Sequence, residues 1–69
     1  MWPKDAKGLV RHLNEWSKNE LDALERPEAH PGWIVSGETR GWVSEHKRML
    51  AELGARIRWD PEKQEYVLV

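Results

Sequence analysis

The chain has 69 residues, with 11 Lys and Arg against 12 Asp and Glu, and its net charge of -1 argues against a protein that attracts polyanions through its overall charge. It has no cysteine, which excludes disulfides and thiolate metal sites. No apolar run approaches the length of a membrane span, and the N-terminal stretch MWPKDAKGL lacks the apolar segment of a secretory signal. We therefore expect one small cytoplasmic domain over residues 1–69, with no membrane partner.

A first helix is predicted over residues 4–16, because its apolar residues recur at helical spacing. The opposite side carries a basic stripe, for which a solvated surface is favoured over contact with phosphates. The apolar face holds Ala6, Leu9, Val10, Leu13 and Trp16, and the basic stripe holds Lys4, Lys7, Arg11 and Lys18.

Two interpretations remain for the residues that follow. Ser17 and Glu20 form the S-x-x-E capping pattern, which indicates that a new helix starts at Ser17. The alternative is one unbroken helix that runs to about Glu25. We favour the break, and in either case Pro27 disfavours helix at the residue before it.

Residues 26–32, RPEAHPG, predict an irregular connector because they contain two prolines and a glycine. The β-prone residues 33–35 predict a very short strand, which we expect to lie beside a C-terminal hairpin as its third strand. Ser36 offers an N-cap for the next helix. Gly41 leaves two alternatives: the helix begins near Thr39, or Gly41 marks a turn between a single helical turn and a longer helix.

The clearest periodicity lies in WVSEHKRMLAELG, which contributes to a predicted helix over residues 39–53. Gly54 stands where a helix C-terminus favours a left-handed residue, and Leu53 is expected to be the last packed position. The core-facing stripe holds Trp42, Val43, His46, Met49, Leu50 and Leu53, the opposite side holds Arg40, Ser44, Lys47, Arg48 and Ala51, and Glu38, Glu45 and Glu52 lie between them.

After Gly54 the polar and apolar residues alternate, which predicts a β-hairpin. Its strands are residues 56–59 and 66–69, and the turn is DPEKQ at residues 60–64. Arg56 and Arg58 are expected on one face, opposite Ile57 and Trp59.

This order of helices, short strand, long helix and hairpin is that of a winged helix. The stretch VSEHKRMLAELG resembles the recognition helix of winged-helix transcription regulators of the MarR and ArsR type, and of the DNA-binding domain of biotin repressor. The hairpin resembles the wing of related regulators, and the resemblance covers about residues 34–69. The matching positions are Val43, Ser44, His46, Leu50, Leu53 and Gly54 in the helix, followed by Ala55, Ile57, Asp60, Tyr66 and Leu68 in the hairpin.

The resemblance implies a cofactor-free DNA-binding protein of the transcription-regulator kind. Its fold would be a small α+β winged helix, with two or three helices, a short strand and a C-terminal β-hairpin. The supporting helix would be residues 17–25, or a turn around residues 37–41. The long helix would enter the major groove of duplex DNA, and hairpin cations would hold flanking phosphates or the minor groove. The candidate DNA-binding residues are Arg40, Ser44, Lys47, Arg48, Arg56, Arg58 and Lys63.

The alternative function is a winged-helix-like module that binds another protein and no nucleic acid. Trp2 and Trp33 would be interface anchors for a homodimer or a protein partner if they lie outside the core. We expect Trp16, Trp42 and Trp59 to fill the core instead.

Enzymatic and metal functions find little support. No nucleophile motif, phosphate loop or HExxH pattern occurs, so we expect neither an enzyme nor a small-molecule substrate. The spacing of His12, His30 and His46 matches no metal motif. His46 is expected to be a half-buried packing residue of the long helix.

Overall fold

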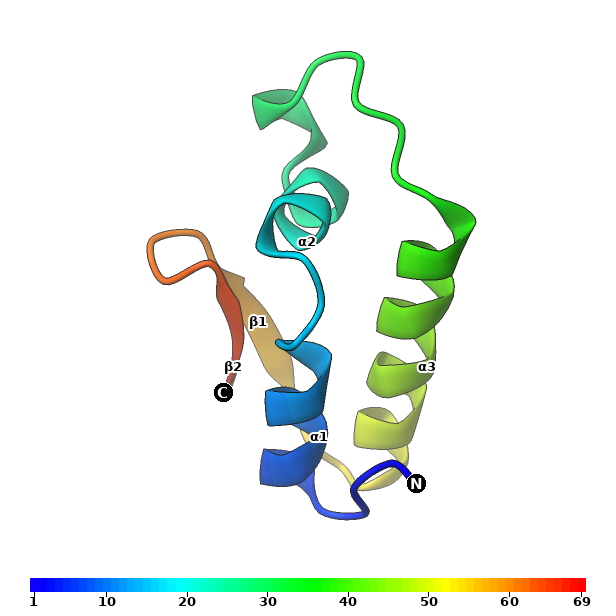
Figure 1. The fold of residues 1–69 in the computed structure, drawn as a ribbon. Helices are drawn as coiled ribbons and strands as arrows, with labels where there is room; N and C mark the ends of the chain where they lie inside the picture. The colour runs from blue at the N-terminus through cyan, green and yellow to red at the C-terminus, as the bar shows by residue number, and fades with distance from the viewer.

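The computed structural model describes all of residues 1–69 and shows three α-helices followed by a two-stranded antiparallel hairpin (Figure 1). This is the small α+β fold expected from the sequence. In chain order the elements are α1 (Ala6–Leu13), α2 (Lys18–Glu25), the 3-10 helix η1 (Pro27–Ala29), α3 (Gly37–Glu52), β1 (Ile57–Asp60) and β2 (Glu65–Leu68).

The favoured break at Ser17 is confirmed, and the predicted first helix over residues 4–16 is too long. Asp5 caps α1, because its Oδ2 accepts a hydrogen bond from the N–H of Gly8 at 3.2 Å. The helix ends at Leu13. Ser17 then caps α2, with its Oγ accepting from the N–H of Glu20 at 3.4 Å.

The predicted strand at residues 33–35 is wrong, since the sheet has two strands and these residues form none. Gly32, with a φ of +80°, turns the chain, and the N–H of Trp33 donates to the carbonyl of His30 at 3.0 Å. The Trp33 indole N–H donates to Glu20 Oε2 at 2.7 Å. The connector is thereby held over α2 at the top of the molecule, away from the hairpin (Figure 1).

A side chain, Asn14, occupies the edge of β2 where a third strand would pair. Its Oδ1 accepts from the N–H of Tyr66 at 2.7 Å, and its Nδ2 donates to the carbonyl of Tyr66 at 2.9 Å. These are the two backbone hydrogen bonds that one residue of a neighbouring strand would make. Asn14 thus attaches the hairpin to the end of α1.

Replacing Asn14 with alanine is expected to lower the free energy of unfolding by about 1–3 kcal/mol, because the buried backbone of Tyr66 loses both partners. Urea unfolding followed by tryptophan fluorescence measures the loss. Asn19→Ala is the matched control, since Asn19 is exposed on α2, and it should change stability by less than about 0.5 kcal/mol. Equal urea midpoints for the two variants would contradict this role of Asn14.

Helix α3 starts earlier than predicted. The Oγ of Ser36 accepts from the N–H of Thr39 at 3.2 Å, so the helix begins at Gly37 and Gly41 lies inside it. At the other end Gly54 has a φ of +72°, as expected of the residue after a helix. Leu53 was expected to be packed, but it is 52% exposed. The helix extends past the edge of the core, and Leu50 is its last buried residue.

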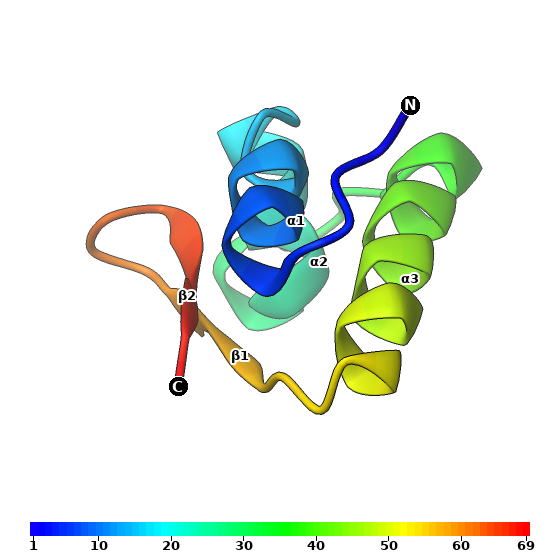
Figure 2. The same ribbon diagram turned by 90° about the horizontal axis from the view of Figure 1, so that it is seen from below.

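The hairpin follows the expected pattern, and each strand is displaced by one residue from its predicted bounds. Trp59 pairs with Tyr66, and Asp60 pairs with Glu65. Asp60 also stabilises the turn, because its Oδ1 accepts from the backbone N–H groups of Glu62 and Lys63 at 3.0 and 3.2 Å. Seen from below, the hairpin lies on the α1 and α2 side of the molecule, across from α3 (Figure 2).

The core lies where α1, α2, α3 and β2 meet. Each of the three tryptophans expected there packs against it, with its indole N–H hydrogen-bonded, as buried tryptophans require. Trp16 donates to the Oγ1 of Thr39 at 2.9 Å, and Trp42 donates to the carbonyl of Leu13 at 3.1 Å. The fully buried centre consists of Leu13, Leu21, Val43 and Tyr66, and the half-buried residues around it are Val10, Trp16, Leu24, Trp42, Ile57 and Trp59.

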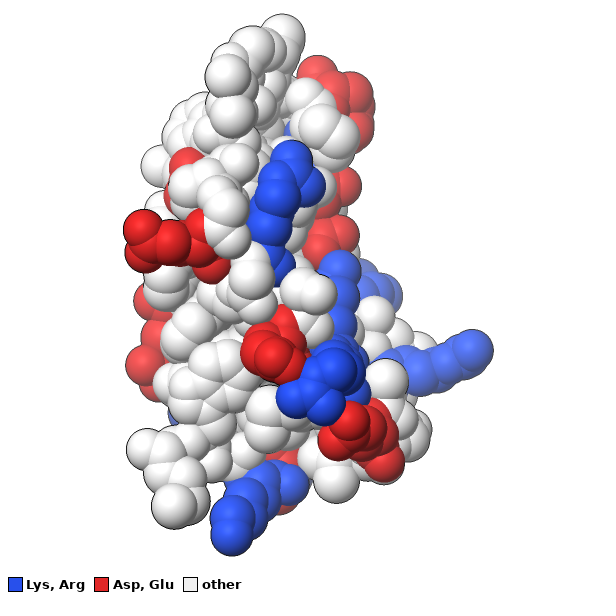
Figure 3. Space-filling view, turned by 90° about the vertical axis from the view of Figure 1, so that its right-hand side faces the viewer, with Lys and Arg blue, Asp and Glu red and all other residues white.

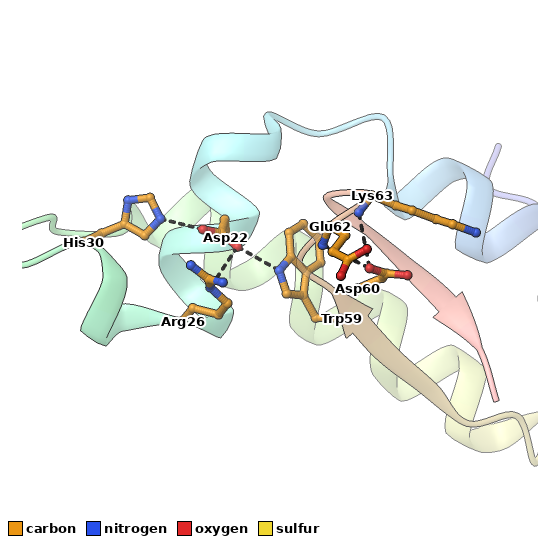
Figure 4. Close-up of polar contacts among 7 residues, drawn as sticks. All are labelled: Asp22, Arg26, His30, Trp59, Asp60, Glu62 and Lys63. Carbon is orange, nitrogen blue, oxygen red and sulfur yellow. Dashed lines mark hydrogen bonds and ion pairs between the residues drawn. The ribbon is translucent and has the colours of Figure 1, made fainter.

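A buried carboxylate, Asp22, links α2 to the connector and to β1 (Figure 4). His30 Nε2 donates to its Oδ2 at 2.6 Å, and Trp59 Nε1 donates to its Oδ1 at 2.8 Å. Arg26 Nε lies 3.4 Å from Oδ1. The hydrogen bond from His30 holds the pKa of Asp22 below its ordinary value against the opposing effect of burial, and Trp59 and Arg26 add to the lowering.

Candidate nucleic-acid interface

The outer side of α3 carries the four candidate residues of that helix. Arg40, Ser44, Lys47 and Arg48 are all exposed. They recur at helical spacing, opposite a buried stripe that includes Val43, and the helix turns its inner side to α1 and α2. Helical periodicity therefore predicted their outward positions correctly.

Two of these cations already have carboxylate partners. Lys47 Nζ lies 2.8 Å from Glu25 Oε2. Arg48 forms ion pairs with Glu45 and with Glu52 on its own helix, the second at 2.6 Å. The hydrogen bond and charge of Glu45, with a further contribution from Glu52, hold the pKa of Arg48 above its ordinary value.

Three of the candidates line one groove between α2 and α3. The groove has a volume of about 390 Å³ and is lined by six residues. Leu24 and Val43 provide its apolar part, while Arg40, Ser44 and Lys47 come from α3. Arg40 has no ion-pair partner, so it is the free cation of this groove.

The hairpin carries the other three candidates. Arg56, Arg58 and Lys63 are exposed, and none of them forms an ion pair. Arg58 lies on the face of β1 opposite Ile57 and Trp59, which pack against the core. Lys63 lies in the turn at the far end of the hairpin.

The structure therefore gathers the candidates in two groups, one on α3 and one on the hairpin. Figure 3 faces the outer side of α3 and shows blue cationic side chains interrupted by red acidic ones. The basic residues form a broken band on this side of the molecule. A ligand of α3 would meet the acidic neighbours as well as the cations.

Glu25 belongs to this site although the sequence did not indicate it. Its Oε2 accepts from Lys47 at 2.8 Å and from the hydroxyl of Tyr66 at 2.6 Å. Burial, reinforced by Glu25, raises the pKa of Tyr66. No signal could reveal this contact in the sequence, because Glu25 and Lys47 lie 22 residues apart on different helices.

The three histidines lie apart from the α3 groove, in two polar arrangements. His30 is bound to Asp22, and His12 is bound to His46 on α3. His46 was expected to be half-buried but is fully buried. No group of three or more His, Cys, Asp or Glu side chains is placed to hold a metal ion.

The fold and the α3 surface define a small α+β protein with a partly neutralised basic helix face. Comparison with protein-family models, with curated proteins and with solved structures gave no match. None of the helices has the length and apolar character needed to cross a bilayer.

Proposed function

We propose that this protein binds duplex DNA in the manner of a winged helix, with α3 in the major groove and the hairpin as the wing. The observation that supports this most is the outer side of α3. It presents Arg40, Ser44, Lys47 and Arg48 on a surface that no other helix or strand covers.

The shape of α3 suits this role. Its 16 residues make a helix about 24 Å long, and an α-helix fits the major groove. Gly41 adds room on the exposed side, since a Cβ at this position would have no neighbour within 4 Å. The helix backbone can therefore approach the base edges closely next to Arg40, whose guanidinium suits bidentate contact with guanine.

The paired and unpaired cations set the expected salt dependence of DNA binding. Lys47 and Arg48 must exchange carboxylate partners for phosphates, while Arg40, Arg56 and Arg58 are unpaired. With about four phosphate contacts, affinity should fall roughly 50-fold between about 50 and 150 mM salt. We also propose that the protein regulates transcription and is located in the cytoplasm.

The test is a fluorescence-anisotropy titration of random-sequence duplex DNA at these two salt concentrations. Arg40→Ala should weaken binding by about 5- to 150-fold, because an unpaired arginine in the groove is lost. Arg11→Ala removes the same charge from the exposed side of α1 and is the matched control, for which little change is expected. Absence of binding at low salt, or equal losses in both variants, would contradict the proposal.

A protein partner is the second candidate, and the connector favours it. Trp33 is 44% exposed and Ile34 is 90% exposed at the top of the molecule. Exposed aromatic residues are frequent anchors of protein interfaces. This candidate predicts no DNA binding in the titration above.

A further inference from the structure

Trp2 docks the N-terminal segment, residues 1–5, onto a cluster of rings between α1 and α3. Its indole stacks on the ring of His46 at a centroid distance of 4.1 Å and an interplanar angle of 23°. It also meets the rings of His12 and Trp42 edge-on, each at 5.4 Å. Figures 1 and 2 both show the N-terminal segment running between α1 and α3. Trp2 thereby covers His46, which is 0% exposed.

The hydrogen bonds below Trp2 assign the protons of the two histidines. His46 Nδ1 lies 2.7 Å from the carbonyl oxygen of Trp42, which can only accept, so Nδ1 carries a proton. In neutral His46 the other nitrogen, Nε2, is then an acceptor. His12 Nδ1, at 2.8 Å, must donate to it.

The hydrogen bonds of the His12–His46 pair can remain after one proton is added to the pair, but not after two. A first proton on His12 Nε2 leaves both hydrogen bonds intact, because that nitrogen makes no hydrogen bond. A second proton must go to His46 Nε2. Two N–H donors would then face each other across 2.8 Å, and two positive rings would be in contact beneath Trp2.

Little else holds the N-terminal segment in place. Residues 1–4 make no hydrogen bond to the rest of the protein. The segment fits against α1 because Gly8 lacks a side chain: a Cβ there would lie 2.7 Å from Pro3 Cβ and 2.7 Å from Asp5 Oδ1. Ring packing by Trp2 and this close contact at Gly8 are the main attachments.

We propose that residues 1–5 are an acid-sensitive strap, which leaves the space between α1 and α3 when both His12 and His46 are protonated. Undocking of Trp2 exposes His46 to water and allows the two charged rings to separate. The helices and the hairpin remain folded, because Trp2 is not part of the central core of Leu13, Leu21, Val43 and Tyr66.

The direction of the pH dependence follows from the surroundings of His46. Burial lowers its pKa, and the charge of His12 on α1 adds to this. The hydrogen bond to the Trp42 carbonyl and the charge of Glu45 on α3 oppose this lowering of the pKa. The strap itself contacts His46 through the uncharged indole of Trp2. The released state therefore binds more protons, and acid favours it. The docked strap therefore loses stability below the ordinary histidine pKa of about 6.5, and the ratio of docked to released strap falls by up to about tenfold per pH unit.

The experiment uses the full chain labelled with 5-fluorotryptophan and followed by ¹⁹F NMR from pH 8 to pH 4. Five resonances are expected from the five tryptophans, and the one absent in Trp2→Phe reports the strap. Below about pH 6.5 this resonance should move toward the position of exposed tryptophan, and that of Trp42 should shift because its ring loses the neighbouring Trp2. The resonances of Trp16 and Trp59 and the far-ultraviolet circular dichroism should stay unchanged. Simultaneous movement of all five resonances would be global unfolding and would overturn the proposal.

Two kinds of variant test separately whether the charge on His12 causes release and whether the strap docks against Gly8. His12→Asn places an amide where Nδ1 of His12 lies, so it keeps a donor toward His46 and cannot become charged. Its amide can rotate to accept from protonated His46, so the strap should stay docked to pH 5 or below. Gly8→Ala should release Trp2 already at pH 7.5, whereas Gly41→Ala, at an exposed glycine with open space, should not. Release of the strap in His12→Asn at the wild-type pH, or a docked Trp2 in Gly8→Ala, would overturn the proposal.

Discussion

Replacing Asp22 with alanine should lower the free energy of unfolding by about 3–5 kcal/mol, because it removes a buried carboxylate that accepts two hydrogen bonds, and a hydrogen bond to a charged group contributes about 1.5–3 kcal/mol. His30 Nε2 and Trp59 Nε1 donate to this carboxylate, and Arg26 Nε lies 3.4 Å from it without a hydrogen bond (Figure 4). A chain of 69 residues has a total stability of roughly 3–10 kcal/mol. The expected loss is therefore a large share of the total stability, and the urea midpoint of the variant should be strongly lowered.

Urea unfolding followed by tryptophan fluorescence measures the effect of this change. The stability of Asp22→Asn should lie between those of Asp22→Ala and the parent, since its amide oxygen keeps an acceptor for Trp59 but its N–H₂ group faces His30. Glu28→Ala on η1 removes a carboxylate from an exposed position, and it should change stability by less than about 0.5 kcal/mol. If Asp22→Ala and Glu28→Ala had equal midpoints, Asp22 could not be the link between α2, the connector and β1.

Replacing Trp42 with alanine should lower the free energy of unfolding by about 3–5 kcal/mol, the range found for removing a large aromatic side chain from a core. Its ring stacks on Trp16 at 4.8 Å and packs on His46 at 4.4 Å. Its indole N–H also holds the carbonyl of Leu13 at the end of α1. The ring thus contributes packing between α1 and α3.

Trp33→Ala removes the same side chain from an exposed place and is the matched control for Trp42→Ala. Trp33 is 44% exposed and makes one exposed hydrogen bond to Glu20, so a loss of about 1 kcal/mol or less is expected. Thermal unfolding by circular dichroism should separate the two variants clearly. Equal melting temperatures would show that Trp42 does not contribute more packing than a surface tryptophan.

Much of the fold could be predicted, because several of its signals are local. The caps at Ser17 and Ser36 act on backbone N–H groups three residues away, and Gly54 sets the end of α3 through its own backbone. Alternation predicted the hairpin, because side chains on successive strand residues point to opposite faces. Helical periodicity placed Arg40, Ser44, Lys47 and Arg48 on the outer side of α3.

Prediction failed where an element depended on a distant partner. The β-prone run at residues 33–35 becomes a strand only if a sheet edge accepts it, and on β2 the carboxamide of Asn14 already occupies that edge. Asn14 and Tyr66 lie 52 residues apart, so no local sequence pattern predicts their contact. Leu53 fitted the apolar stripe but lies beyond the end of the core.

The sequence by itself determined the order of the helices and the C-terminal hairpin, and which side of α3 faces outward. These follow from hydrogen bonds and periodicities within a few residues along the chain. Only the tertiary structure decided that Glu25 neutralises Lys47, that Asp22 joins three segments, and that His12 meets His46 beneath Trp2. Those contacts depend on how the helices pack, because side chains that are far apart in the chain must be brought within a few ångströms of each other.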